Sequence, residues 1–151
     1  MKPNAAKQVA RVTPDSGYRL EQQVGFILRQ ASQRHAAIFA ARIPEQLTAT
    51  QFSTLVRLQE VGPYSQNQLG RLTAMDAATI KGVTDRLIQR GFVAATLDPE
   101  DGRRRMLALT SAGLDAVARA IPAGLEITAE TLEPLSAEER EQFIKLLKKL
   151  R

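Results

Sequence analysis

The sequence contains no cysteine and a single histidine among its 151 residues. The lack of cysteine excludes disulfides, thiolate metal sites and thiol-based redox sensing. One histidine, His35, leaves almost nothing with which to build a transition-metal site or a pair of histidine and nucleophile. No phosphate-binding loop is present either. The sequence therefore does not indicate an enzyme, and no metal or cofactor is expected.

Long apolar runs are also missing. No run approaches the ~18 residues of a membrane span, and residues 1–23 lack the apolar core of a signal peptide. We therefore expect a cytoplasmic protein that does not bind membranes. Apolar residues still make up 44% of the chain, enough for one buried core, and the length fits a single domain over residues 1–151.

The chain carries more positive than negative charge. Lys and Arg number 21 against 16 Asp and Glu, which gives a net charge of +5 and a pI near 10.0. This excess favours a polyanionic partner such as nucleic acid, although charge alone does not identify one.

Apolar periodicity and helix caps predict a mainly helical chain. From Tyr18, apolar residues recur at three- and four-residue steps, which predicts a helix ending before Pro44. Three later helix starts carry a capping box, and Thr110 is a cap without the box. The boxes pair Thr48 with Gln51, Ser65 with Gln68, and Ser136 with Glu139. Helices are expected at about 49–60, 66–73, 76–90, 111–133 and 137–150, and Pro122 is expected to kink or break the fourth of these.

Between residues 90 and 110 the pattern changes to two short β-capable runs. Residues 92–97 and 106–109 flank a segment that is first turn-forming and then strongly basic. This pattern predicts a β-hairpin with arginines at its tip.

The two helices before this hairpin have the spacing of a helix-turn-helix. The major groove of DNA admits one helix, whose amino-terminal residues meet base edges while the preceding helix meets phosphates. A helix pair occurs in any helical bundle, so the hairpin matters: guanidinium groups at a protruding tip can enter the minor groove. A solvated hairpin with a charged turn is the simpler alternative, but it does not explain why Arg103, Arg104 and Arg105 directly follow a helix pair.

These residues resemble the multiple-antibiotic-resistance regulators, the MarR family. Asp101-Gly102-Arg103, then Leu109-Thr110 and Gly113, match the family's wing signature D-x-R-x5-L-T-x-x-G without a gap. Residues 48–55, 65–70 and 85–93 are similar to the start of its second helix, its third helix and the end of its recognition helix. The resemblance covers about residues 20–151.

The resemblance implies a dimeric winged-helix repressor whose first and last helices interlock and which an aromatic acid often releases from its operator. One departure concerns the recognition helix. Many members read T-V-T-R where this chain has Thr79-Ile80-Lys81-Gly82, so base contacts are expected to rest on other residues.

The expected fold is therefore mainly α with a small β-wing. Residues 48–110 would form the winged helix-turn-helix lobe, and residues 18–43 and 111–151 the helices of a dimerisation region. The apolar stripe of the last helix could also suit a membrane surface, but a partner helix is the commoner use of such a stripe.

The recognition helix has a core face and an outer face. Ile80, Val83, Leu87 and Ile88 are spaced to pack inward, so the small and charged residues between them lie outward.

Asp85 and Arg86 are expected to pair with neighbours, and Asp101 to orient the Arg103 guanidinium. Ser65 and Gln66 would meet phosphate at a helix start, with capping as the competing explanation. Arg104 and Arg105 point to alternate faces, so at most one of them shares the direction of Arg103. The predicted DNA-binding residues are Ser65, Gln66, Ala77, Ala78, Lys81, Gly82, Asp101, Arg103, Arg104 and Arg105.

His35 lies on the apolar stripe of the first helix. It either bonds across a helix interface or belongs to a cleft whose aromatic walls and cationic groups suit a small aromatic carboxylate. The predicted ligand-binding residues are Arg11, Tyr18, Arg34, His35, Phe39, Phe52 and Arg57.

The function we predict is a homodimeric repressor that binds a pseudo-palindromic double-stranded DNA operator and is released by a small aromatic acid. Two alternatives stay open. One is a repressor without an effector, and the other is a helical small-molecule-binding or scaffold protein with no DNA role.

Overall fold

The computed structural model describes residues 17–151, apart from the side chain of Val61. These residues fall into two compact units, residues 17–34 and His35–Arg151. The first contains the short 3-10 helix η2 (Leu20–Gln22) and the amino-terminal part of α1 (Val24–Arg42). None of the helices in the described part of the chain combines the length and the apolar character that crossing a bilayer requires.

The second unit holds the remaining elements. In chain order they are the end of α1, η3 (Pro44–Gln46), α2 (Ala49–Val61), β1 (Tyr64–Ser65), α3 (Gln66–Leu72), α4 (Ala77–Gln89), β2 (Val93–Leu97), β3 (Arg105–Leu109), α5 (Ser111–Thr131) and α6 (Ala137–Lys148).

Helix α1 begins later than the apolar pattern predicts. Gln23 is extended (φ −83°, ψ 126°), and its side-chain Nε2 donates to the Arg19 carbonyl at 2.9 Å. Residues 18–23 therefore do not join the α-helix. No residue of α1 is fully buried and Val24 is 66% exposed, but Ile38 and Phe39 near its carboxyl end pack against the core.

The predicted caps start the later helices. At α2, the Thr48 hydroxyl accepts from the Gln51 N–H at 3.2 Å, and the Gln51 side chain accepts from the Thr48 N–H at 3.0 Å. The same reciprocal box begins α3 at Ser65 and α6 at Ser136. Thr110 caps α5 as predicted. Each cap satisfies backbone donors that have no partner within the helix.

Helix α5 runs unbroken through Pro122, so the expected break is absent. Val117 and Ala120 before the proline and Ile127 after it are all buried. Packing on both sides of Pro122 stabilises a single helix despite the missing backbone N–H.

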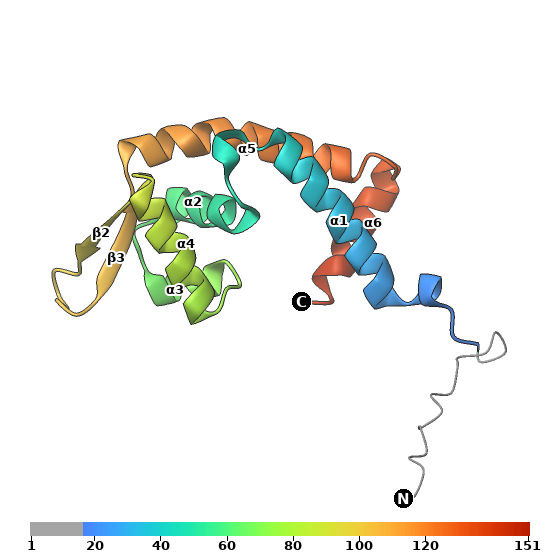
Figure 1. The fold of residues 1–151 in the computed structure, drawn as a ribbon, viewed down its shortest axis with the longest axis horizontal. Helices are drawn as coiled ribbons and strands as arrows, with labels where there is room; N and C mark the ends of the chain where they lie inside the picture. Colours follow the sequence, from blue (N-terminus) through green and yellow to red (C-terminus); the bar gives the residue numbers. More distant parts are fainter. Residues whose placement is uncertain (1–16) are drawn as a thin grey trace, which may run out of the picture. The chain divides into compact units, whose positions relative to one another are not determined.

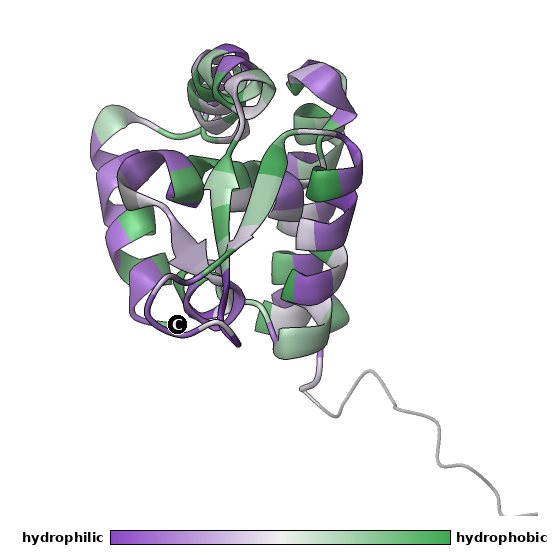
Figure 2. Ribbon diagram, turned by 90° about the vertical axis from the view of Figure 1, so that its left-hand side faces the viewer, coloured by the Kyte–Doolittle hydropathy of each residue, from purple (hydrophilic) through white to green (hydrophobic). Residues whose placement is uncertain are grey.

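The strands form a three-stranded antiparallel sheet in the order β1-β3-β2. Strand β3 pairs with β2 from Val93–Leu109 to Leu97–Arg105, as the predicted hairpin requires. Strand β1, only two residues long, pairs with β3 at Tyr64–Leu107 and was not predicted. The hairpin extends from the helices (Figure 1), and the loop at its tip is hydrophilic (Figure 2).

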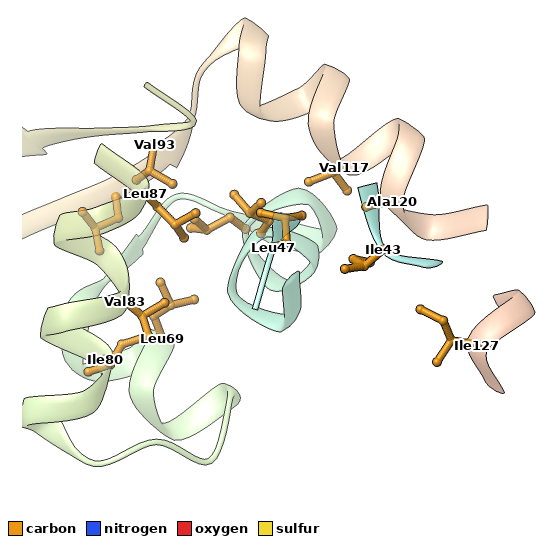
Figure 3. Close-up of a cluster of buried hydrophobic side chains, with 13 residues drawn as sticks. Ile43, Leu47, Leu69, Ile80, Val83, Leu87, Val93, Val117, Ala120 and Ile127 are labelled. Atoms are coloured by element: carbon orange, nitrogen blue, oxygen red, sulfur yellow. The ribbon is translucent and has the colours of Figure 1, made fainter. Parts of the chain in front are cut away.

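One core joins α2, α3, α4, α5 and the sheet. Leu69, Ile80 and Leu87 are at most 1% exposed; Leu69 and Ile80 lie between α3 and α4, and Leu87 lies beside Val93 (Figure 3). Burying each such side chain contributes on the order of 2 kcal/mol. The core thereby fixes α4 against α3 and leaves the opposite face of α4 to solvent.

The break between α3 and α4 is tight. Ala74 takes a left-handed backbone conformation (φ 54°), and the Met75 N–H donates to the Gly70 carbonyl at 2.9 Å. A Cβ at Gly70 would lie 3.1 Å from the Met75 oxygen and 3.2 Å from Ile80, so the glycine permits this close turn. The resulting arrangement of α3, α4, β2 and β3 is a winged helix.

Candidate nucleic-acid interface

Helix α4 presents the predicted outer face. Ile80, Val83 and Leu87 are buried as expected, while Ala77, Ala78 and Lys81 are exposed. Gly82 is half-buried, but no atom lies within 4 Å of the Cβ that it lacks. Ala77, Ala78 and Gly82 therefore make the outer face nearly flat at the start of the helix, and Lys81 and Asp85 project from it.

Asp76 begins this helix and lies beside its outer face. Its Oδ1 accepts from the Thr79 N–H at 2.7 Å. This hydrogen bond, together with a weaker one from the Thr79 hydroxyl, lowers the pKa of Asp76 below its usual range. The carboxylate is therefore ionised at neutral pH and stabilises the amino terminus of α4.

Ser65 and Gln66, the two residues predicted to contact DNA at the start of α3, differ in burial and in hydrogen bonding. Ser65 is 7% exposed, and its hydroxyl accepts from the Gln68 N–H at 3.4 Å and donates to the Gln68 side chain at 2.9 Å. Capping accounts for Ser65. Gln66 is half-buried at the surface and makes no such bond, so it is the better candidate for a DNA contact.

The wing turn corrects one prediction. The Asp101 carboxylate accepts from the backbone N–H of Arg103 at 3.1 Å, two residues on, which is the usual bond of an Asp side chain in a turn. Within residues 17–151 no ion pair holds the Arg103 guanidinium. Asp101 therefore shapes the loop and does not orient the arginine side chain.

Arg104 and Arg105 diverge, as strand alternation predicts. Arg104 Nη2 donates to Gln68 Oε1 at 3.1 Å, and its Nη1 lies 3.9 Å from Asp98, so it joins the wing to α3. Arg105 Nη1 lies 3.6 Å from the Asp85 carboxylate of α4. Both arginines connect the wing to the helix pair.

An open groove of about 590 Å³ lies between α3 and the wing. Its lining is polar and basic, and includes Asn67 and Arg71, which sequence reasoning missed. They lie four residues apart on α3, a spacing that could have placed them on one face. The groove residues are Ser65, Gln66, Asn67, Gln68, Arg71, Asp101, Arg103, Arg104 and Arg105.

Asp85 was expected only to pair with neighbours, and its pairing is more extensive than that. Its Oδ2 accepts from Lys81 Nζ at 2.6 Å, and its Oδ1 faces Arg105. The bond from Lys81, then the charges of Lys81 and Arg105, lower the pKa of Asp85 below its usual range. The carboxylate is thus a fixed negative charge between α4 and the wing.

The candidate ligand-binding residues are only partly brought together. His35 and Phe39 have ring centroids 6.3 Å apart, and those of Phe39 and Phe52 are 6.1 Å apart, so three of them form an aromatic row. His35 Nδ1 also lies 2.9 Å from the Thr131 hydroxyl, the interface bond that was the alternative.

The other candidates are placed differently. Arg57 donates to Glu60 at 2.6 Å and to the Leu72 carbonyl at 3.3 Å, so it does not converge on His35. It shares with Phe52 a separate groove between α2 and α5. Tyr18 and Arg34 belong to the first unit, and Arg11 lies outside the described residues.

Comparison with known proteins gives consistent matches. A model of the MarR family matches residues 47–104. The HTH-type transcriptional repressor NicR of Pseudomonas putida is 39% identical over 147 residues, which cover 93% of each chain.

Solved structures agree. A probable transcriptional regulator from Pseudomonas aeruginosa is 53% identical with a TM-score of 0.86, over 88% of this chain and all of that one. BpsR of Bordetella bronchiseptica, whose DNA binding is regulated by 6-hydroxynicotinic acid, is 40% identical with a TM-score of 0.84, over 88% of this chain and 96% of its own. Because NicR matches nearly the whole chain, and because the wing signature lies on the observed hairpin, this protein belongs to the MarR family of winged-helix transcriptional regulators.

Proposed function

We propose that this protein is a homodimeric transcriptional repressor that binds a pseudo-palindromic DNA operator. The observation that supports this most is the basic groove between α3 and the wing, which adjoins the flat outer face of α4 through the contact of Arg105 with Asp85. The relative NicR is named a repressor. Such a role agrees with the cytoplasmic location expected from the sequence.

Each element would have its own role on the duplex. Ala77, Ala78 and Lys81 would enter the major groove, where an alanine methyl can contact a thymine methyl and a lysine can donate to guanine. Arg103, whose guanidinium has no ion pair among the described residues, would enter the neighbouring minor groove. Gln66 would meet the phosphates between these two contacts.

Exposed apolar surface supports dimerisation. No residue of α6 is buried, and Phe143, Leu146 and Leu147 on this helix are at least 40% exposed. Residues 17–34 likewise bury nothing, and Leu20, Ile27 and Leu28 are more than 40% exposed. Large exposed apolar surfaces mark interaction sites. A second copy of the chain would cover both, and two-fold symmetry would set the α4 helices about 34 Å apart, one turn of DNA.

A small aromatic carboxylate would release the protein from DNA. The aromatic row of His35, Phe39 and Phe52 supports this, as does the regulation of BpsR by 6-hydroxynicotinic acid. An effector that binds better to the DNA-incompetent state lowers operator affinity by that difference in binding. Calorimetry with 6-hydroxynicotinic acid and a panel of benzoates should detect binding that His35→Ala and Phe39→Ala weaken. Absence of binding by every acid would favour a repressor without an effector.

The DNA role is tested by titrating the protein onto labelled duplex from the region upstream of its own gene, at about 50 mM and 200 mM salt. We expect tight binding that falls steeply with salt, because each phosphate contact releases counterions. A shuffled duplex of the same composition is the control. No binding at the lower salt would contradict the proposal and favour the scaffold alternative.

A further inference from the structure

The clearest unexplained feature of the candidate interface is its acidic residue, Asp85. It lies between two cations from different elements, Lys81 on α4 at 2.6 Å and Arg105 at the start of β3 at 3.6 Å. Both cations were predicted to contact DNA. A carboxylate at this place repels phosphates and so weakens binding to any DNA sequence.

Stability does not account for this carboxylate. The Lys81 side chain is 64% exposed and that of Arg105 is 44% exposed, and ion pairs this exposed contribute little to stability because solvent screens them. The order along the helix is also the less favourable one, since an acid stabilises a helix better when it precedes the lysine by four residues. Asp85 follows Lys81 and lies in the carboxyl-terminal half of α4, where the helix dipole disfavours negative charge.

The geometry is better suited to controlling the two cations. One N–H of the Lys81 ammonium donates to Asp85, which leaves two donors on a side chain that the bond directs toward Asp85. Arg105 is similarly drawn toward Asp85 on α4. A lysine held in this way can donate to the guanine O6 and N7 atoms where the sequence places them, but it must break its bond to reach a phosphate.

We propose, on the basis of the DNA-binding function proposed above, that Asp85 is a specificity-determining positioning residue, whose bonds to Lys81 and Arg105 penalise phosphate contacts on every sequence and leave base contacts at the operator unpenalised. It selects the operator mainly by weakening binding to all other DNA. Specificity is a difference between two affinities, and repulsion at the wrong sites can produce it.

The experiment compares wild type with Asp85→Asn, which keeps the shape and removes the charge. The measurements are dissociation constants for the upstream duplex and for the shuffled duplex at two salt concentrations. We expect Asp85→Asn to bind shuffled DNA several-fold more tightly, with a steeper salt dependence, while the operator gains less. The affinity for the upstream duplex divided by the affinity for the shuffled duplex should fall about fivefold or more.

Asp115→Asn on α5 is the matched control, because it removes the same charge from another exposed position. A fall in the ratio with Asp85→Asn that Asp115→Asn does not reproduce supports the inference. Equal effects of the two variants would overturn it, because net charge alone would then explain the change. Weaker binding of Asp85→Asn to both duplexes would also overturn it, since Asp85 would then merely brace the wing.

The same substitution in a protein that lacks Lys81 tests the role of the Lys81–Asp85 bond. When Asp85→Asn is added to the Lys81→Gln variant, it should no longer lower the ratio of operator affinity to shuffled-DNA affinity, because the cation that Asp85 binds is gone. An undiminished effect would contradict the role assigned to Lys81. Wild-type protein that does not distinguish the two duplexes would instead refute the proposed function itself.

Discussion

Gly113 and Gly82 have opposite physical roles. Gly113 belongs to the wing signature and lies where α5 passes the chain before β2, so that a Cβ there would collide with the Phe92 carbonyl oxygen. Gly82 is in the middle of α4, and a Cβ there would meet nothing within 4 Å. The signature glycine is thus required by packing, whereas packing of the chain itself does not require Gly82.

Alanine substitutions should therefore change stability in opposite directions. Gly113→Ala should lower the free energy of unfolding by about 1–3 kcal/mol, because the backbone must move to accommodate the methyl group. Gly82→Ala should raise it by about 0.5–1 kcal/mol, because alanine favours the helix. Urea denaturation measures both, and loss of stability in Gly82→Ala would show that an unrecognised contact surrounds this position.

Gly82→Ala should nevertheless weaken operator binding. If α4 lies deep in the major groove, the added methyl group meets the bases at the place where many family members carry an arginine. A duplex titration of the stabilised variant separates the two effects. Operator affinity equal to that of wild type would show that this part of α4 does not approach the bases.

In the proposed complex, the minor-groove contact would depend on the side chain of Arg103. Arg103→Ala should weaken operator binding by about 1–3 kcal/mol, because a guanidinium inserted between phosphates is lost, while dimerisation and unfolding stay unchanged. Lys149→Ala on the exposed carboxyl-terminal segment is the control for loss of one positive charge. Unchanged operator affinity in Arg103→Ala would remove the wing from the mechanism.

Among the elements, α4 shows how a cap makes stability depend on pH. The folded protein lowers the pKa of Asp76, so the ionised cap stabilises the fold above the unfolded pKa, and this stabilisation is lost as pH falls through the folded pKa. Asp76→Asn still caps α4 but does not ionise. Its free energy of unfolding should fall less than that of wild type between about pH 5 and pH 3. Identical pH profiles in urea denaturation would contradict the role of this cap.

The elements predictable from the sequence were those with local signals. The capping boxes at Thr48, Ser65 and Ser136 depend on residues three apart, so the sequence placed these helix starts to within a residue. Strand β1 has two residues and no periodicity, and it exists because β3 offers an edge to pair with. The continuity of α5 through Pro122 likewise depends on tertiary packing.

In the candidate site, too, the features that depend on local spacing were predictable and those that depend on tertiary packing were not. The outer face of α4 follows from helical spacing, and the divergence of Arg104 and Arg105 follows from strand alternation. Their partners, Gln68 and Asp85, could not be inferred, because they depend on how the wing folds back on the helices. For the same reason the sequence suggested that Asp101 binds the side chain of Arg103, whereas it binds its backbone.

At the scale of the whole molecule, the exposed apolar residues of α6 support the proposed dimer. Leu147→Glu should dissociate the dimer, because it places a charge in a surface that a second copy would bury, and it should leave the fold intact because Leu147 is exposed in the single chain. Sedimentation velocity measures the change. Gln142→Glu adds the same charge to the same helix and serves as the control. A Leu147→Glu variant that stays dimeric would exclude α6 from the interface.

In the proposed dimer, each half-site of the operator would receive one α4 and one wing. Hydroxyl-radical footprinting of the upstream duplex tests this arrangement most directly, since the radical attacks the sugars from the minor groove. We expect two protected minor-groove stretches, symmetric about the operator centre and each outside a half-site, and both should weaken in Arg103→Ala. A single protected stretch, or protection that Arg103→Ala leaves unchanged, would contradict the proposed arrangement.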